Sequence, residues 1–342
     1  MTVPSPVLAA YGLAAAHTTA IDVGLINQTY EVAVEGEPRF VLQRLHAIFA
    51  GEVCLDLEAI SEHVARAGLG TPRLVRTSEG EPFVVHDGVW RLITYVPGRT
   101  IASVEDPRHA FEAARLASRF HAAVSSLEHR FHFTRAGVHD TRAHLARLER
   151  WLVDGTHHAE HADNAAIAES ILAHARTLDA LPDVPQRIVH GDLKISNVRF
   201  DASLEHAVAL IDLDTLAHGT MAFELGDALR SWAQRGTENV RDARADAAVV
   251  HHALAGYAAG GFELTADERA SIILGLETVS TELAARFAVD AWEDAYFGWD
   301  KVRYASRREH DRARAASQLS LAISVRRDRV ALESIAQNAF SK

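Results

Sequence analysis

The hydrophobic period of this chain changes near Pro97 and Gly98, and this change limits the folds available to it. Before that point, residues 29–34 and 39–45 are β-branched, aromatic and aliphatic runs, separated by a turn-forming Glu-Gly-Glu-Pro segment,. After it, apolar residues recur at the spacing of amphipathic helices. The chain is therefore expected to be an α+β protein, with a small antiparallel sheet followed by a large, mostly helical part.

We expect two lobes, residues 1–95 and residues 96–342, because the turn at Pro97 and Gly98 is a plausible hinge,. In the first lobe the patterns predict a hairpin, then a helix over 52–67 and strands over 73–76, 83–86 and 89–95. In the second they predict helices over 107–127, 140–153, 162–178, 222–234, 242–259, 265–289 and 305–338. Short strand-like runs at 187–189, 197–200 and 207–211 interrupt this helical pattern.

Composition excludes several classes of partner. The chain has 35 Lys and Arg against 46 Asp and Glu, so its net charge of −11 lacks the basic footprint of a nucleic-acid binder,. Cys54 is the only cysteine, which rules out an intrachain disulfide and favours a cytoplasmic location,. No uncharged apolar run approaches the roughly 20 residues that span a bilayer, so no membrane association is expected. The oligomeric state is left open.

Three polar side chains lie at the ends of short strands. Asp192 and Asn197 belong to the loop HGDLKISN at residues 190–197, and Asp212 follows the apolar run that ends at Ile211. A hairpin between these strands would bring Asp212 beside Asn197. One carboxylate can orient a hydroxyl and accept its proton, and the other two groups are oxygen ligands suited to magnesium. We therefore expect Asp192 to be the catalytic base of a phosphoryl transfer, with Asn197 and Asp212 holding Mg²⁺ beside ATP.

The HGDLKISN and IDLD segments resemble the catalytic and metal-binding loops of the aminoglycoside phosphotransferase and choline kinase superfamily, which is related to the protein kinases. This resemblance implies a two-lobe, protein-kinase-like fold. It extends from about residue 20 to near the C-terminus. The further segments LINQTY, FVLQRL, FELGDALR and ELAARF, in this order, are similar to the branch that contains N-acetylhexosamine 1-kinase.

The resemblance also implies how the nucleotide is bound. Arg44 falls where kinases place the strand lysine that contacts the α- and β-phosphates, and the only lysines here are Lys194, Lys301 and Lys342,. The acidic partner of Arg44 would be Glu58, with Glu62 as the competing choice. The remaining positions assigned to the nucleotide are the phosphate-lid residues Gly24, Asn27 and Thr29 and the base-contacting residues Thr94, Tyr95 and Val96.

Other roles are less specific. His190 is expected to brace the loop rather than take part in the chemistry. Asp214 is either a further metal ligand, a substrate contact or a turn cap, and a supporting role is favoured. Asp227 and Arg286 match substrate-binding positions of the resembled branch, but Asp227 can equally cap a helix and Arg286 can equally pair with a structural carboxylate.

The leading expectation is an ATP- and magnesium-dependent kinase that phosphorylates a small-molecule hydroxyl, with a sugar such as an N-acetylhexosamine as the first choice of acceptor. Leu25 and Ser231 depart from the sugar-kinase pattern, which expects a histidine and an aromatic residue there. Kinases of amino alcohols, homoserine-like compounds or aminoglycosides therefore remain as alternatives. A non-catalytic nucleotide sensor is the alternative from another class, and a glycosyltransferase using Asp212 and Asp214 leaves HGDLKISN unexplained.

Overall fold

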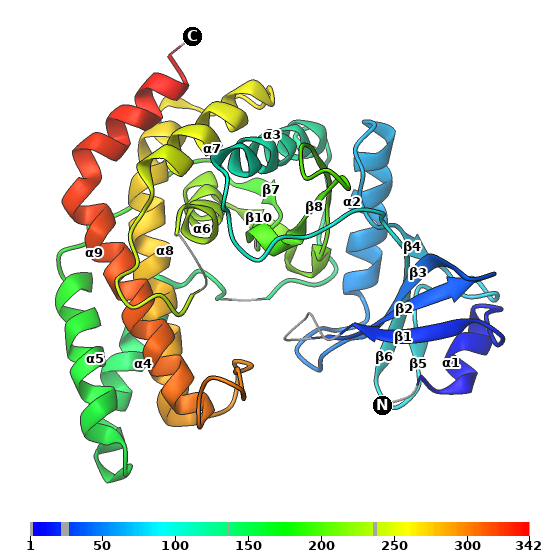
Figure 1. Cartoon of the computed structure of the whole chain (residues 1–342), viewed down its shortest axis with the longest axis horizontal. Helices are drawn as coiled ribbons and strands as arrows, with labels where there is room; N and C mark the ends of the chain where they lie inside the picture. The colour runs from blue at the N-terminus through cyan, green and yellow to red at the C-terminus, as the bar shows by residue number, and fades with distance from the viewer. Residues whose placement is uncertain (1–2, 22–26, 136, 235–237, 342) are drawn as a thin grey trace.

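A computed structural model describes residues 3–21, 27–135, 137–234 and 238–341. Figure 1 shows a small sheet region at one side of the molecule and a larger helical part at the other, as the sequence predicts. The small region contains α1 (Ser5–Ala10), β1 (His17–Ile21), β2 (Gln28–Val34), β3 (Glu37–Arg44), α2 (Val53–Arg66), β4 (Leu74–Val75), β5 (Val84–Val85) and β6 (Val89–Thr94).

These strands form one antiparallel sheet in the order β1-β2-β3-β6-β4, with β5 pairing on β6. The predicted hairpin is confirmed as β2 and β3, which pair from Gln28 opposite Arg44 to Val34 opposite Glu37. Strand β1 was not predicted. It is an edge strand with no buried residue, so it lacks the alternation of apolar and polar side chains that identifies a half-buried strand,.

The larger part contains the other long helices. They are α3 (Pro107–Val124), α4 (Thr141–Asp154), α5 (His161–Ala175), α6 (Met221–Ala233), α7 (Ala247–Ala259), α8 (Ala266–Glu293) and α9 (Arg307–Ala339). The expected start of α7 at residue 242 is wrong, because Asp246 caps the helix and its side chain accepts a hydrogen bond from Ala248 N at 2.9 Å,. None of the described helices has the length and apolar character to cross a membrane.

Two small antiparallel strand pairs lie among these helices and carry the polar loops. Strand β7 (Arg187–Val189) pairs with β10 (Ala217–Gly219), and β8 (Val198–Phe200) pairs with β9 (Ala207–Leu210). Short 3-10 helices follow at η2 (Ile195–Asn197) and η3 (Leu213–Thr215), and another, η1 (Gly155–His157), follows α4. The β8–β9 pairing is what brings the end of β9 beside the loop that precedes β8.

The largest hydrophobic core joins the small region to the helical part. Leu57 and Ile60 of α2 and Ile93 of β6 belong to the same buried cluster as Phe120 of α3 and Leu210 of β9. Because α2 packs on the helical part, the two regions share a core. The lobe boundary expected after residue 95 stays a prediction, although β6 ends one residue before it.

Helices α6 and α8 approach closely through two glycines. A Cβ added to Gly275 would lie 2.0 Å from the carbonyl oxygen of Ala222, and one added to Gly226 would lie 2.5 Å from the carbonyl carbon of Gly275. The backbones are therefore in direct contact, with no room for a side chain between them. This contact fixes the position of α6, which carries several polar residues described below.

We expect Gly275→Ala to lower the free energy of unfolding by about 1–3 kcal/mol, because the added methyl group must push α6 and α8 apart. Urea denaturation of the purified variant measures this loss. Ala270→Ser, at an exposed position of the same helix, is the control and should stay within about 0.5 kcal/mol of the parent. Equal stability of Gly275→Ala and the parent would contradict the close packing.

Candidate active site

A buried carboxylate holds the start of the HGDLKISN loop. Glu224, in the first turn of α6, accepts hydrogen bonds from the backbone N–H groups of His190 and Gly191, both at 2.9 Å. Its Oε1 also lies 3.0 Å from Nε2 of His121 on α3. Burial opposes ionisation of Glu224, but these partners, His121 foremost, hold the pKa of this carboxyl below its usual value,.

Helix α6 also holds the end of the same loop. The hydroxyl of Ser231 accepts a hydrogen bond from Ile195 N at 3.0 Å, and the indole N–H of Trp232 donates to the carbonyl of Leu193 at 2.8 Å. At the turn itself, Gly191 has φ +77°, and a Cβ there would lie 2.4 Å from the carbonyl oxygen of Thr215,. The loop is thus fixed along its length by one helix.

His190 connects this loop to the strand that precedes Asp212. Its Nε2 lies 3.0 Å from the carbonyl oxygen of Ile211, and its own carbonyl accepts a hydrogen bond from Thr215 Oγ1 at 2.8 Å. The ring is fully buried. This position suits the bracing role predicted for His190.

Asp192 and Asp212 lie beside the ammonium group of Lys194, and Asn197 contacts Asp192. The Lys194 Nζ is 2.5 Å from Oδ2 of Asp192 and 4.0 Å from Oδ2 of Asp212. The side-chain amide of Asn197 donates to the carbonyl oxygen of Asp192 at 2.9 Å and to its Oδ2 at 3.2 Å. The structure therefore brings the three predicted side chains into one polar group, and Lys194 joins them.

The electrostatics of the two aspartates differ. Burial raises the pKa of Asp212, and the negative charge of Asp214 raises it further,. For Asp192, burial is outweighed by the charge of Lys194, which lowers the pKa. The side chains of Asp192 and Asp212 are 27% and 40% exposed, so small molecules in solution can reach both carboxylates.

The donor set of this group fits a hard divalent cation. It consists of carboxylate and amide oxygens, which are the ligands that magnesium prefers. The crowding of Asp192, Asp212 and Asp214 raises the pKa of Asp212, and a dication would relieve that repulsion. Asp212 has φ +65° and ψ +58°, so the chain turns sharply where β9 ends and η3 begins,.

Asp214 points toward the small region, where it forms a buried ion pair. Its Oδ1 is 2.5 Å from Nη1 of Arg91 on β6, and its Oδ2 accepts a hydrogen bond from Asn27 Nδ2 at 2.7 Å. Arg91 also donates twice to Oε1 of Gln43, at 2.9 and 2.7 Å. Asp214 therefore links the segment that carries Asp212 to the sheet, a contact that was not among the roles expected for it.

The expected ion pair between Arg44 and Glu58 is not formed. Arg44 contacts the carbonyl and carboxylate of Asp87 and lies 6.0 Å from the ring centre of Trp90, whereas Glu58 pairs with Arg76 at 2.5 and 2.7 Å. The alternation of side chains between the two faces of β3 explains why Arg44 does not meet Glu58.

In β3, Arg44 shares a sheet face with the buried Leu42, while Gln43 lies on the opposite face, directly across from Arg91,. Glu62, the competing partner, has no ion pair with Arg44 among the described residues.

The segment expected to contact the nucleotide base is partly occupied by the protein. Thr94 N donates to the carbonyl of Arg73, Tyr95 N donates to that of Arg39, and the carbonyl of Val96 accepts from Arg199 at 2.8 Å. Within the described residues, the backbone N–H of Val96 has no protein acceptor.

Of the expected lid residues, Asn27 holds Asp214 and also accepts a hydrogen bond from His46 N at 2.9 Å. Thr29 Oγ1 lies 3.5 Å from Nε2 of Gln43. Gly24, together with Leu25, falls outside the described residues.

The expected substrate residues Asp227 and Arg286 both have protein partners. Asp227 Oδ1 is 2.8 Å from Nε of Arg230, and Nη1 of Arg286 is 4.0 Å from Oε1 of Glu282. His139 lies beside the second pair, with its Nδ1 3.2 Å from Oε1 of Glu282. The charge of Arg230 lowers the pKa of Asp192.

Sequence reasoning assigned no role to Lys194, Arg91 and Glu224. Lys194 carries a visible signal, since it is the only lysine between residues 1 and 300 and lies inside the motif. Arg91 could have been found from its place in an apolar strand, where a charged residue needs a partner. No local sequence feature distinguishes Glu224 from an ordinary acidic residue at a helix start, because its hydrogen-bond donors come from the loop that precedes β8.

We expect Glu224→Gln to lower the free energy of unfolding by about 1–3 kcal/mol near neutral pH, because two backbone donors lose a charged acceptor. The ionised carboxylate stabilises the fold above its usual pKa of 4.5, and that contribution is lost as the pH falls through the lowered pKa of the folded state,. The difference between parent and variant should thus shrink in acid.

Urea denaturation at several pH values measures this difference. Glu263→Gln, at an exposed position, is the control and should show no such dependence. A difference that grew as the pH fell would contradict the proposed hydrogen bonding of Glu224.

Comparison with known proteins adds independent information. The fold is similar to an aminoglycoside phosphotransferase from Alicyclobacillus acidocaldarius subsp. acidocaldarius DSM 446, with 18% identity, a TM-score of 0.63 and coverage of 100% of this chain and 98% of that chain. It is similar to a microcompartment-associated aminopropanol kinase at 16% identity and TM-score 0.64, covering 96% and 97%. The amicoumacin kinase hAmiN, in complex with AMP-PNP, Ca²⁺ and Ami, matches at 16% identity and TM-score 0.60, covering 89% and 87%.

At these identities the solved structures establish a shared fold. The sequence itself matches the model of the phosphotransferase enzyme family, APH, over residues 17–259, and this match covers more than half of the chain. It includes the sheet region, the HGDLKISN loop and the segment with Asp212 and Asp214. The chain therefore belongs to the phosphotransferase enzyme family.

Proposed function

We propose that this protein transfers the terminal phosphate of ATP to a hydroxyl group of a small molecule, with Asp192 as the base. The observation that carries this proposal is that Asp192 and Asp212 both lie beside Lys194 while Asn197 donates to Asp192, in a partly exposed group beside the sheet region. Such a group contains the parts that phosphoryl transfer needs, namely a carboxylate for the incoming hydroxyl and oxygen ligands for a divalent cation.

In this reaction Asp192 accepts a hydrogen bond from the acceptor hydroxyl and orients its oxygen toward the terminal phosphorus. It takes the hydroxyl proton as the new P–O bond forms and the bond from that phosphorus to the bridging oxygen breaks, which releases ADP. Lys194 keeps Asp192 ionised and places a positive charge where negative charge gathers on the phosphate. Asn197 and Asp212 would hold Mg²⁺, which when bound neutralises charge on the nucleotide phosphates. Alignment of the reacting groups then supplies much of the rate.

ATP is proposed to bind between the sheet region and the loop. The backbone N–H of Val96 can donate to the base, while the neighbouring carbonyl is held by Arg199. Arg91, rather than Arg44, is the arginine that lies toward the metal-binding segment, where it positions Asp214. The solved amicoumacin kinase of the same fold contains AMP-PNP and Ca²⁺, which supports a nucleotide triphosphate with a divalent cation.

For the acceptor we favour a neutral sugar, such as an N-acetylhexosamine. The carboxylates near Asp192 are paired with arginines, since Arg230 contacts both Asp227 and Glu238, and Arg286 faces Glu282. Paired charges offer both donors and acceptors to a polyhydroxyl compound. A polycationic aminoglycoside would gain more from unpaired carboxylates.

Ser231 does not weaken the choice of a sugar, because its hydroxyl holds the loop at Ile195 N. Amino alcohols and homoserine-like compounds are the alternatives within the same chemistry. The buried free Cys54 suits the reducing cytoplasm proposed as the location,.

A screen for ADP release tests this proposal over free sugars, amino sugars, choline, homoserine and aminoglycosides. Turnover that depends on one class identifies the acceptor, and NMR gives the position of the phosphate. Calorimetric binding of ATP with Mg²⁺ but no acceptor-dependent turnover across the panel would instead indicate a nucleotide sensor.

We expect Asp192→Asn to reduce the turnover number by about 10²–10⁴-fold, because the hydroxyl loses its proton acceptor. The affinity for ATP with Mg²⁺ should change little, since Asn197 and Asp212 remain. ADP-coupled kinetics and calorimetry measure the two quantities. Asp183→Asn, at an exposed position, is the control, and near-normal turnover of Asp192→Asn would remove the proposed base.

Removing Lys194 should move the acid limb of the pH profile of kcat/KM to higher pH. Burial raises the pKa of Asp192, and the charge of Lys194 outweighs this effect. In Lys194→Met the carboxylate therefore takes up a proton at higher pH and stops acting as a base there. Lys301→Met, which lies over Trp299, is the control, and an unmoved acid limb in Lys194→Met would contradict the coupling.

A further inference from the structure

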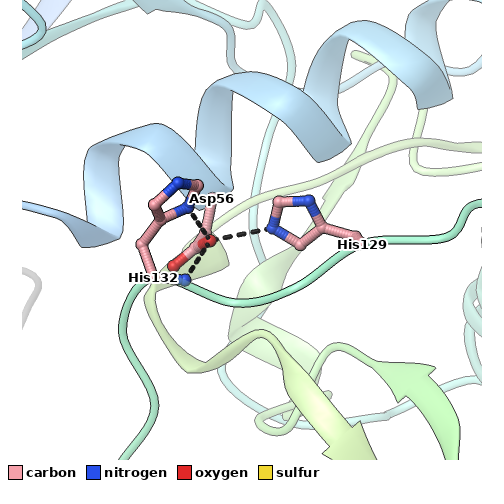
Figure 2. A group of neighbouring side chains, drawn as sticks. All are labelled: Asp56, His129 and His132. Atoms are coloured by element: carbon pink, nitrogen blue, oxygen red, sulfur yellow. Dashed lines mark hydrogen bonds and ion pairs between the residues drawn. The ribbon is translucent and has the colours of Figure 1, made fainter.

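Two histidines and an aspartate converge outside the proposed active site (Figure 2). Asp56 lies on α2, and His129 and His132 lie on the segment that follows α3. Each residue offers one ligand atom, and the three atoms lie within 4.8 Å of one another. Among the described residues, this is the only group of three histidine, cysteine or acidic side chains that meets this condition.

The ligand atoms gather around one carboxylate oxygen. Oδ1 of Asp56 is 2.8 Å from Nε2 of His129 and 3.0 Å from Nδ1 of His132. Zinc binds such atoms at about 2.0–2.2 Å, so tetrahedral ligands are about 3.3 Å apart. The two distances from Oδ1 would therefore have to lengthen by about 0.3–0.5 Å for the ion to be bound.

The carboxylate is already oriented by the backbone. Oδ1 of Asp56 accepts a hydrogen bond from His132 N, and Oδ2 accepts one from Phe133 N, both at 2.9 Å. Burial opposes ionisation of Asp56, yet the hydrogen bonds from His132, His129 and Phe133 lower its pKa. In metal sites, hydrogen bonds from groups outside the coordination shell hold a carboxylate ligand in place, and the backbone donors do the same for Asp56.

We propose that Asp56, His129 and His132 bind a transition-metal dication, with Zn²⁺ as the best match, and that the ion ties α2 to the segment after α3. Imidazole nitrogen and carboxylate oxygen are both zinc ligands, and three protein ligands leave one position for water. The His132 side chain is 49% exposed, whereas that of Asp56 is 2% exposed. The ion can therefore enter from the His132 side.

Metal binding would replace the hydrogen bonds that the two rings now make to Asp56. Each neutral ring carries its proton on the other nitrogen when it binds a metal, so neutral rings release no proton. A protonated ring must lose one, and acid should therefore weaken binding. The site differs from that of Asn197 and Asp212, which offers only oxygen ligands suited to Mg²⁺.

A bound ion would connect α2 more firmly to the helical part. Phe133, next to His132, packs against Phe49 before α2, and α2 also contacts η3, which carries Asp214. An ion at Asp56 would add a link between α2 and the helical part. Because it binds the folded chain and needs ligands from two separate segments, it should raise the melting temperature.

The proposal is tested by titrating the full, untagged chain with Zn²⁺. The titration is done in excess Mg²⁺, so that sites made of oxygen ligands are already occupied. Calorimetry should show one tight equivalent, and Co²⁺ in place of Zn²⁺ should give the visible spectrum of a four-coordinate nitrogen and oxygen site. His132→Ala and His129→Ala should each lose more than about a hundredfold in affinity, beyond the loss of about 10–100-fold that is typical of an outer-shell contact. They should also lose the Zn²⁺-dependent rise in melting temperature.

His251→Ala is the matched control, because His251 is an exposed histidine elsewhere on the chain, and it should bind like the parent. Melting curves without metal show whether each variant is folded. Since His132 is half-exposed, His132→Ala keeps the test interpretable if His129→Ala fails to fold. Equal affinity of His132→Ala and the parent, or loss of the tight equivalent in His251→Ala as well, would overturn the proposed site. Neither readout depends on kinase activity.

Discussion

The candidate active site depends on one buried carboxylate. Glu224 accepts hydrogen bonds from the backbone N–H groups of His190 and Gly191, and within the described residues these two donors have no other backbone acceptor. A carboxylate satisfies both at once, since each of its oxygens can accept one bond. Glu224 lies on α6, and α6 packs closely against α8 through their glycines. The loop with Asp192 is therefore anchored to a pair of tightly packed helices. Preorganisation of this kind is what phosphoryl transfer requires.

A second constraint is the buried pair between Arg91 and Asp214. It joins the sheet to the segment that carries Asp212, and it leaves the side chain of Asp212 only partly buried. The pair is fully desolvated, so loss of either partner would leave an uncompensated charge. The consequence is a fixed relation between the sheet, where the nucleotide is proposed to bind, and the aspartate proposed to hold the metal.

Much of the site could be predicted because the motif is contiguous. Asp192 and Asn197 are close in sequence. The strand after Asn197 and the strand before Asp212 both have a clear apolar pattern, so the pairing of these two strands was predictable. The contacts of Arg44 could not be predicted, because the sequence of β3 does not say which face of the strand is turned toward the helical part. Burial of Leu42 places Arg44 on the other side, beside Trp90.

The sequence by itself determined the order of elements, the α+β class and the polar groups of the HGDLKISN loop, because hydrophobic period and local turn chemistry act over a few residues. Tertiary structure alone decided which charges meet. Arg91 with Asp214, Glu224 with the loop, and Asp56 with two histidines are contacts between residues far apart in the chain. Their partners are selected by packing of whole helices and strands, and no local pattern carries that information.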